Sequence, residues 1–408
     1  MRILEFIKQN CKNVEFHALG DIGEFFGGLS GKTKEDFKNG NAKYITYKNI
    51  FSNHKTNLEL CEFVKIKENE KQNSLKFGDV LFTISSETQN ECAMSSVICQ
   101  EIKEPIYLNS FSFCFRPKEN LLLPDFCAYL FRSSAVREKL IKTANGVTRF
   151  NVSRKKVAEI KIPVPSLEVQ NKIVEVLDSF SSLVRSLVLE KTAREKQYKY
   201  YLNHLITNAR NSRILKLGEV AKIITGSTPS KSNAEFYGGE IPFYKPADLN
   251  FGYYVENSAD KISKKGYEIS RKLPEKSILV TCIGATIGKV GFIRKAGICN
   301  QQINAVLPNE NFIPEYIYFC LISDIFQGYI KKYKTSSTMP ILNKTNFEKL
   351  EIPLPPLDEQ ERIVGILDSL NELANGLSAG IPKEIELRQK QYEYWRDRLL
   401  EFPSKDSK

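Results

Sequence analysis

The stretch "GATIGKVG" at Gly284–Gly291 comes nearest, in this sequence, to a phosphate-binding loop. Such a loop has four residues between its glycines, and the Lys that follows is itself followed by Ser or Thr. Here three residues separate Gly284 from Gly288, and Val290 follows Lys289. The stretch therefore predicts a tight strand–turn–strand with Lys289 at its tip, where its ammonium group could touch a phosphate.

Other residue types that carry catalysis are present without the spacing that catalysis needs. The sequence has no Asn/Asp-Pro-Pro-Tyr/Phe motif for amino methylation, and no dinucleotide-binding fingerprint. The three histidines, His17, His54 and His204, lack metal-ligand spacing, and we expect structural or surface roles for them. Glu359 and Glu361 are expected on a solvated helix surface, without an acid–base role. We therefore predict no catalytic residue, no metal site and no cofactor.

The composition favours a basic protein with more than one domain. Its 408 residues, 42% of them apolar, are too many for one ordinary core. The net charge of +11 is typical of nucleic-acid binders, although many basic proteins bind nothing acidic. No apolar run is long enough for a membrane span, the N-terminus lacks a signal-peptide pattern, and nine cysteines without CxxC spacing favour reduced thiols. We expect a cytoplasmic protein.

The sequence repeats itself. Lys161–Phe180 aligns with Glu351–Leu370 at an offset of 190, and ten of the twenty positions are identical. Upstream, "LGDIGEFFGG" aligns with "LGEVAKIITG" at an offset of 198; downstream, "REKQYKYYLNHLI" aligns with "RQKQYEYWRDRLL" at 194. Each unit thus has a variable part of about 140 residues and a better-matched tail of about 45. The variable parts are expected to do different jobs, and the tails the same job twice.

Each tail has the pattern of a long helix. Prolines precede it, because proline is excluded from a helix interior. In the first tail apolar residues then recur at alternating steps of four and three, which predicts a coiled-coil seam on a helix over about 167–207: Ile173, Leu177, Phe180, Val184, Leu187, Tyr198, Tyr201 and Leu205. In the second tail the corresponding positions are Ile363, Leu367, Leu370, Ala374 and Leu377, and Gly380 and Pro382 should interrupt the helix.

Two such helices pack most simply antiparallel, with an approximate twofold axis between the copies. The predicted fold class is α+β: two mixed α/β domains in tandem, separated by two long helices that form an antiparallel coiled coil. The aromatic residues of the two "KQY.Y" segments favour ordinary core or interface packing over a partner-docking patch.

The repeated residues resemble the specificity subunits of type I restriction-modification systems. "TGSTPSKSNAEFYGGEIPFYKPADL" (Thr225–Leu249) is similar to the start of that family's target-recognition domains, and "IPLPPLDEQERIVGILD" is similar to the junction into its conserved helix. The first copy lacks the Thr-Pro-Ser and aromatic-Gly-Gly elements. The resemblance covers nearly the whole chain, and predicts five parts: a short N-terminal helix (1–12) that completes the repeat, target-recognition domains at 13–160 and 211–350, a central conserved helix at 161–210 and a C-terminal conserved helix at 351–408.

The resemblance implies a non-catalytic subunit that reads a split, asymmetric DNA sequence. Each target-recognition domain would read one half of the site, while the helices set the gap and hold two adenine methyltransferase subunits. A restriction subunit that translocates and cleaves DNA would complete the complex. The alternative is a coiled-coil scaffold that binds protein or RNA, and the salt dependence of duplex binding would distinguish the two, because DNA binding releases counterions.

Basic and amide side chains in the loops of the variable parts are the candidate DNA contacts, since base edges and phosphates need such donors. The segments 142–155 and 331–344 occupy equivalent places and both mix Lys or Arg with Thr, Ser and Asn. The predicted DNA-binding residues are Lys32, Lys34, Lys43, Lys48, Asn49 and Arg149 in the first copy, and Lys231, Lys245, Lys289, Lys332, Lys334 and Thr338 in the second.

Overall fold

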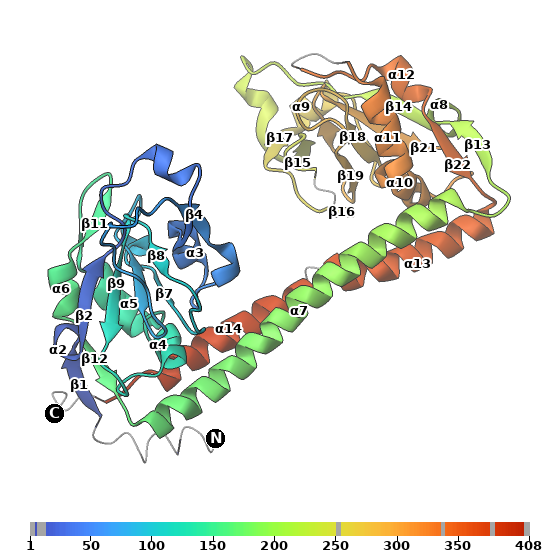
Figure 1. The fold of residues 1–408 in the computed structure, drawn as a ribbon. Helices are drawn as coiled ribbons and strands as arrows, with labels where there is room; N and C mark the ends of the chain where they lie inside the picture. Colours follow the sequence, from blue (N-terminus) through green and yellow to red (C-terminus); the bar gives the residue numbers. More distant parts are fainter. Residues whose placement is uncertain (1–4, 6–13, 250–253, 336–338, 376–379, 404–408) are drawn as a thin grey trace. The chain divides into compact units, whose positions relative to one another are not determined.

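A computed structural model describes residues 5, 14–249, 254–335, 339–375 and 380–403 (Figure 1). The chain forms two compact units, one made of residues 1–185 and 387–408 and the other of residues 186–386. Each unit contains one variable part of the repeat together with segments of both tails. The helix expected at 1–12 lies, apart from Glu5, outside the described residues, as do Thr338 and Leu377.

The variable part of the first unit is built on small, mostly antiparallel sheets. Four strands pair in the order β2 (Gly23–Gly27), β9 (Ser112–Pro117), β5 (Val80–Thr83) and β7 (Ser95–Val97). The others are β4 (Glu62–Val64), β3 (Ala42–Ile45) and β8 (Ile106–Leu108); β10 (Ala144–Asn145), β11 (Phe150–Val152) and β6 (Ser85–Ser86); and the ribbon of β1 (Glu15–Ala18) with β12 (Lys161–Val164).

Short helices join and cover these strands. They are α2 (Leu19–Ile22), α3 (Tyr47–Ser52), α4 (Pro124–Leu130), α5 (Ser134–Ile141) and α6 (Arg154–Ala158), with 3-10 turns η1 (Lys34–Phe37), η2 (Leu58–Leu60) and η3 (Gln89–Glu91). Pro124 suits the first turn of α4, where its missing N–H would have no helical partner. Nearly all of α4 is buried, so this helix fills the space between the four-stranded sheet and the tails.

The second unit repeats this arrangement. Its large sheet has the order β14 (Ala221–Thr225), β21 (Ile303–Pro308), β18 (Ile278–Thr281), β19 (Val290–Ile293) and β16 (Tyr254–Val255). The other strands are β17 (Asp260–Ile262), β15 (Tyr237–Tyr244) and β20 (Ile298–Cys299), and the ribbon of β13 (Arg213–Lys216) with β22 (Glu351–Leu354). The helices are α8 (Leu217–Val220), η4 (Ala234–Phe236), α9 (Lys264–Glu268), α10 (Pro314–Ile322), α11 (Asp324–Tyr333) and α12 (Lys344–Glu348).

Strand register confirms the duplication at the level of single residues. Phe25 lies opposite Phe115 in the first unit, and Ile223 lies opposite Val306 in the second. Residues 25 and 223 differ by 198, the offset read from the sequence for this segment, and residues 115 and 306 differ by 191. The predicted fold class, two mixed α/β domains in tandem with two long helices, is therefore confirmed.

The tails form long helices, as expected. The first is α7 (Leu167–Thr207), whose residues 167–185 belong to the first unit and 186–207 to the second. The described parts of the second tail are α13 (Leu357–Asn375) and α14 (Ile381–Leu399), and Gly380 forms a bend directly before α14, where Gly380 and Pro382 predicted a break. Pro382 lies in the first turn of α14, a position that proline tolerates.

Within each unit the variable part packs on the start of one tail and the end of the other. Ile173 and Leu177 of α7 share the first unit's core with Leu399 of α14. In the second unit Leu202 and Ile206 of α7 share a core with Ile363 and Leu367 of α13. In that unit the backbone N–H of Arg210, beyond α7, donates to the Glu359 carboxylate near the start of α13, so the two helices run antiparallel there.

Two details of the helix prediction were wrong. The seam at the end of α7 uses Leu202 and Ile206, whereas Tyr201, expected in the seam, is 37% exposed. Glu359 is not a solvated surface residue but is buried. Its side-chain hydrogen bond with Arg362 lowers the pKa of its carboxyl to about 2, which keeps it charged in this buried position.

Among the described residues no helix is long and apolar enough to cross a membrane. The eight cysteines in the described part of the chain are free thiols, and most of them are buried in the domain cores.

Candidate nucleic-acid interface

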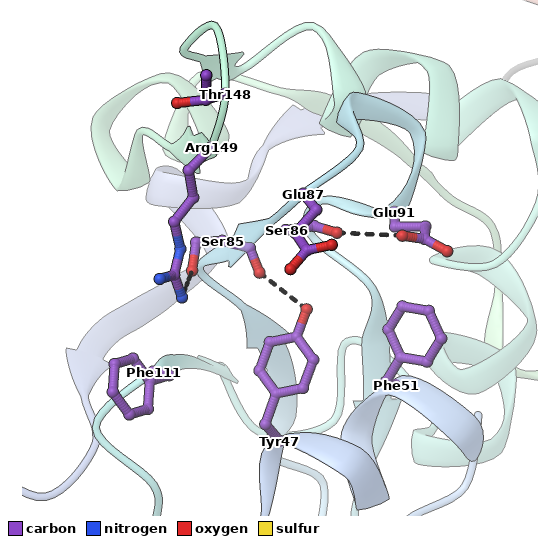
Figure 2. Close-up of a pocket in the computed structure, with 9 residues that line it drawn as sticks. All are labelled: Tyr47, Phe51, Ser85, Ser86, Glu87, Glu91, Phe111, Thr148 and Arg149. Atoms are coloured by element: carbon purple, nitrogen blue, oxygen red, sulfur yellow. Dashed lines mark hydrogen bonds between the residues drawn. The ribbon is translucent and has the colours of Figure 1, made fainter.

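Three segments of the first variable part converge on a cleft of about 700 Å³ (Figure 2). They are helix α3, the loop 84–93 between β5 and β7, and the hairpin that joins β10 to β11. Figure 2 shows the side chains that line the cleft, which come from these segments and, for Phe111, from the turn between β8 and β9: Tyr47, Phe51, Ser85, Ser86, Glu87, Glu91, Phe111, Thr148 and Arg149. The cleft combines aromatic rings with charges of both signs.

Backbone pairing fixes the two loops against each other. Phe150 and Asn151 of β11 pair with Ser86 and Ser85 of β6. The Tyr47 hydroxyl donates to the Ser85 carbonyl oxygen at 2.8 Å, and Arg149 Nη2 donates to Ser85 Oγ at 3.2 Å. Ser85 therefore joins all three segments.

Two half-buried arginines position the walls of the cleft. Arg137 of α5 donates to the carbonyl oxygens of Asn90, Cys92 and Ala93, at 2.8, 2.7 and 2.5 Å, which anchors the base of the loop 84–93. Arg132, after α4, donates to the carbonyl oxygens of α3 and β7. Burial lowers the pKa of each arginine to about 10, a cost that their several hydrogen bonds offset.

The second unit has the same backbone arrangement at the equivalent loop, formed by different residues. Ile283 pairs with Ile341, as Ser85 pairs with Asn151, and Gln327 donates to the Gly288 carbonyl oxygen at 3.0 Å, as Arg137 donates to Ala93. Backbone bonds close the first loop at Thr83–Met94 and the second at Thr281–Lys289. The loop thus has ten residues (84–93) in the first unit and seven (282–288) in the second.

The equivalent positions differ in chemistry. The register of the hairpins places Met339 where the first unit has Arg149. The strands β9 and β21 place Gln302 where the first unit has Phe111. One framework therefore presents a guanidinium group and an aromatic ring in one unit, and a thioether and an amide in the other.

Of the first copy's predicted contacts, Arg149 lies in the cleft. Lys48 is exposed on α3 beside Tyr47, and Lys34 is exposed on η1. The Lys43 ammonium group forms an ion pair with Glu104 at 2.6 Å, on the sheet of β3. The proposal of Lys34, Lys43, Lys48 and Arg149 as DNA contacts is retained.

Two residues of that set are withdrawn. Asn49 is 3% exposed, and its side-chain amide donates to the Asn57 carbonyl oxygen at 2.7 Å, so it stabilises the end of α3 instead of meeting a base. The Lys32 side chain is 5% exposed, because its ammonium group bonds Glu70 and the carbonyl oxygen of Lys65. A charge paired and buried in this way gains little from a phosphate.

The second copy's candidates are more dispersed. Lys289 directly follows the loop 282–288 and is half-buried, so it does not lie at the tip as expected. Lys245 forms an ion pair with Asp260, Lys332 lies at the end of α11, and Lys334 caps that helix. Lys231 is exposed between β14 and η4, and Thr338 lies outside the described residues.

Sequence reasoning missed the aromatic and acidic residues of the cleft. It searched for basic and amide side chains, whereas Tyr47, Phe51, Phe111, Glu87 and Glu91 line the same hollow. Phe111, which is 60% exposed, follows "YLNS" in the variable part of the first copy.

Comparison with known proteins agrees with this architecture. The family described as "Type I restriction modification DNA specificity domain" matches residues 11–193 and 210–387, that is, both copies of the repeat. The chain belongs to the type I restriction-modification DNA specificity family. Its variable parts are accordingly target-recognition domains, and the chain is a type I specificity subunit with a DNA-recognition function.

Individual relatives support this assignment. The specificity subunit of type I restriction enzyme EcoR124I/EcoR124II from Escherichia coli is 36% identical over 272 residues, 63% of this chain and 66% of the relative. The HindI specificity subunit from Haemophilus influenzae is 23% identical over 76% of this chain and 84% of its own length.

Solved structures share the fold. A chain from a type I R-M system, solved for its complex assembly and conformational transition, has a TM-score of 0.67 at 18% identity and covers 95% of this chain and 98% of its own. The HsdS subunit from Thermoanaerobacter tengcongensis has a TM-score of 0.50 at 18% identity, with 98% and 95% covered.

Proposed function

We propose that this specificity subunit reads a bipartite, asymmetric DNA site, one half with each target-recognition domain. The observation that carries the proposal is that equivalent positions of the two domains carry different side chains, Arg149 and Phe111 in one domain and Met339 and Gln302 in the other. A protein with two DNA readers reads two half-sites, and unlike readers need unlike half-sites. The basic residues retained above would supply the sequence-independent phosphate contacts.

We further propose that the subunit is non-catalytic and acts in the cytoplasm. In this proposal its tails hold two adenine methyltransferase subunits, and restriction subunits join the complex. The repetition of the tail sequence supports two identical partners, since the same surface occurs twice. The five-part division (1–12, 13–160, 161–210, 211–350 and 351–408) is kept as the domain description that goes with this function.

Genome-wide mapping of N6-methyladenine, in cells with and without this gene, tests the proposal. We expect a split, asymmetric methylated motif that disappears on deletion. Exchanging residues 211–350 for another such domain should change one half of the motif only; a change in both halves would contradict the two-reader arrangement. Lengthening the helix next to Gly380 should change the gap between the halves.

A binding titration separates this function from the scaffold alternative. Duplex affinity should fall steeply between about 50 and 200 mM salt, because each phosphate contact releases a counterion. A scaffold that binds proteins would show no duplex affinity at any of these salt concentrations.

A further inference from the structure

The cleft of the first target-recognition domain holds opposite charges that do not neutralise each other. Arg149 comes from the hairpin, and Glu87 and Glu91 come from the loop 84–93 (Figure 2). Among the described residues none of the three forms an ion pair. Arg149 donates one hydrogen bond, to Ser85 Oγ, so most of its five N–H groups are available to a ligand.

The two glutamates are held differently. Glu91 Oε2 accepts hydrogen bonds from the hydroxyls of Ser86 and Thr88, at 3.2 and 2.8 Å, which ties Glu91 to its own loop. Glu87 is exposed, and its carboxylate has no hydrogen bond within the described part of the chain. Glu87 is therefore the acceptor available to a ligand, while Glu91 shapes the loop that carries it.

A carboxylate on a surface that meets DNA is repelled by the phosphates, so it must gain a compensating contact. The donor that suits it is the N4 amino group of cytosine, and the acceptors that suit an arginine are O6 and N7 of guanine. A G·C base pair presents this donor and these acceptors side by side at its major-groove edge. The opposite charges of the cleft match that edge.

We propose that the first target-recognition domain reads one G·C base pair through this cleft. Arg149 donates to guanine O6 and N7, and Glu87 accepts from cytosine N4. This assignment rests on the proposed function and names the base pair and the residues of one half-site. Three aromatic rings of the cleft would shield these contacts from water. Tyr47 and Phe51 are stacked, with ring centroids 6.1 Å apart, and the ring of Phe111 is exposed beside them.

The second domain lacks this pair of charges at the equivalent place. Met339 replaces Arg149, and the loop that carries Glu87 is three residues shorter there, seven against ten. This pair of side chains, and the G·C contact proposed for it, therefore belongs to the first domain. This difference also supplies matched variants within one chain.

The test is the methylated motif produced in cells by the full chain and its variants, followed by duplex titration. The variants Arg149→Met, which copies the second domain, and Glu87→Gln should each relax one G·C position of one half-site and leave the other half unchanged. Against a duplex carrying A·T at that position, discrimination should fall about 5- to 150-fold. Glu119→Gln, an exposed glutamate of the same domain outside the cleft, is the control and should leave the motif intact.

The outcomes are distinguishable. If the unaltered chain yields no split motif, the proposed function fails. If it yields a motif that Arg149→Met and Glu87→Gln both leave unchanged, the proposed function stands and the assignment of the cleft is wrong. Relaxation of the same single pair by both variants supports the assignment, and it excludes a general folding defect, which would weaken the whole motif.

Discussion

Asn203 near the end of α7 and Asp324 at the start of α11 exchange two hydrogen bonds. Asn203 Oδ1 accepts the Asp324 backbone N–H at 2.7 Å, and Asn203 Nδ2 donates to the Asp324 carboxylate at 2.9 Å. The equivalent contact in the first unit keeps the backbone hydrogen bond and reverses the side-chain one: the Asp397 carboxylate of α14 accepts from the backbone N–H and the hydroxyl of Ser134, at 2.9 and 2.6 Å. In each unit, the side chain near the end of the long helix and the residue of the target-recognition domain that it contacts are thus complementary as hydrogen-bond donors and acceptors.

These contacts predict a rescue experiment. Asn203→Asp should lower the free energy of unfolding of the second unit by about 1–3 kcal/mol, since it removes a donor and places two carboxylates together. Adding Asp324→Ser should restore much of the loss, because it reproduces the Asp397–Ser134 contact of the first unit. Thermal melts of the single and double variants provide the measurement; a double variant less stable than Asn203→Asp would disprove this account.

Gly226 offers a packing prediction. A Cβ atom there would lie 2.1 Å from the carbonyl oxygen of Asn300, and the equivalent Gly28 has the same conflict with Asn109 at 1.9 Å. Gly226→Ala should therefore destabilise the second unit by about 2–4 kcal/mol, since backbone must move. Gly365→Ala is the control: nothing lies within 4 Å of its Cβ position, and alanine in a helix should stabilise by about 0.5–1 kcal/mol. Denaturant unfolding of both variants gives the comparison, and equal effects would contradict the argument.

The repeat itself explains why the fold could be predicted from the sequence. Pro163 and Pro165 exclude a helix interior at these positions, so the helix must begin after them. The regular apolar steps that follow predict the bounds of α7 to within a residue. The spacing alone does not decide which residues near the end of α7 face the seam, because Tyr201 and Leu202 are adjacent and both can pack in an apolar core. Only the packing against α10 and α13 decides which one is buried.

The binding residues were harder to predict, because pairing and burial depend on distant segments. Lys32 is neutralised by Glu70 and Asn49 is bonded to Asn57, and no local pattern marks either contact. Arg149 was found because the hairpin aligns between the copies. Glu87 was missed because the search was limited to donors, whereas a base edge also offers an amino group to an acceptor.

His54 predicts a pH dependence of stability. Burial, with the nearby charges of Lys55 and Arg132, lowers the pKa of its imidazole to about 4, and Asp178, which acts oppositely, and Arg185 are the other charged groups around it. The unfolded chain, with a pKa near 6.5, binds the proton more readily, so stability is full above about pH 6.5. It should fall by about 3 kcal/mol as pH drops from 6.5 to 4.

Denaturant unfolding of the full chain at several pH values measures this loss. The variant His54→Asn removes the titrating group and should show a shallower decline over the same interval. Identical slopes for the two proteins would assign the acid sensitivity to carboxylates such as Asp178, whose hydrogen bonds with Tyr129 and Lys55 lower its pKa despite its burial.

Tyr200 and Tyr394 predict where the proposed partners bind. They occupy equivalent positions of the two tails and each is 62% exposed, whereas Tyr198 and Tyr392 of the same "KQY.Y" segments pack against the cores. Exposed aromatic rings that recur at equivalent places are the kind of anchor that interfaces use. The expectation that these tyrosines serve packing thus holds for Tyr198 and Tyr392.

Replacing Tyr200 and Tyr394 by alanine should reduce co-purification of methyltransferase subunits by at least about tenfold, with little change in the melting temperature. Replacing Tyr198 and Tyr392 instead should lower the melting temperature first. If the exposed pair can be removed without loss of partner, the subunits dock elsewhere on the tails.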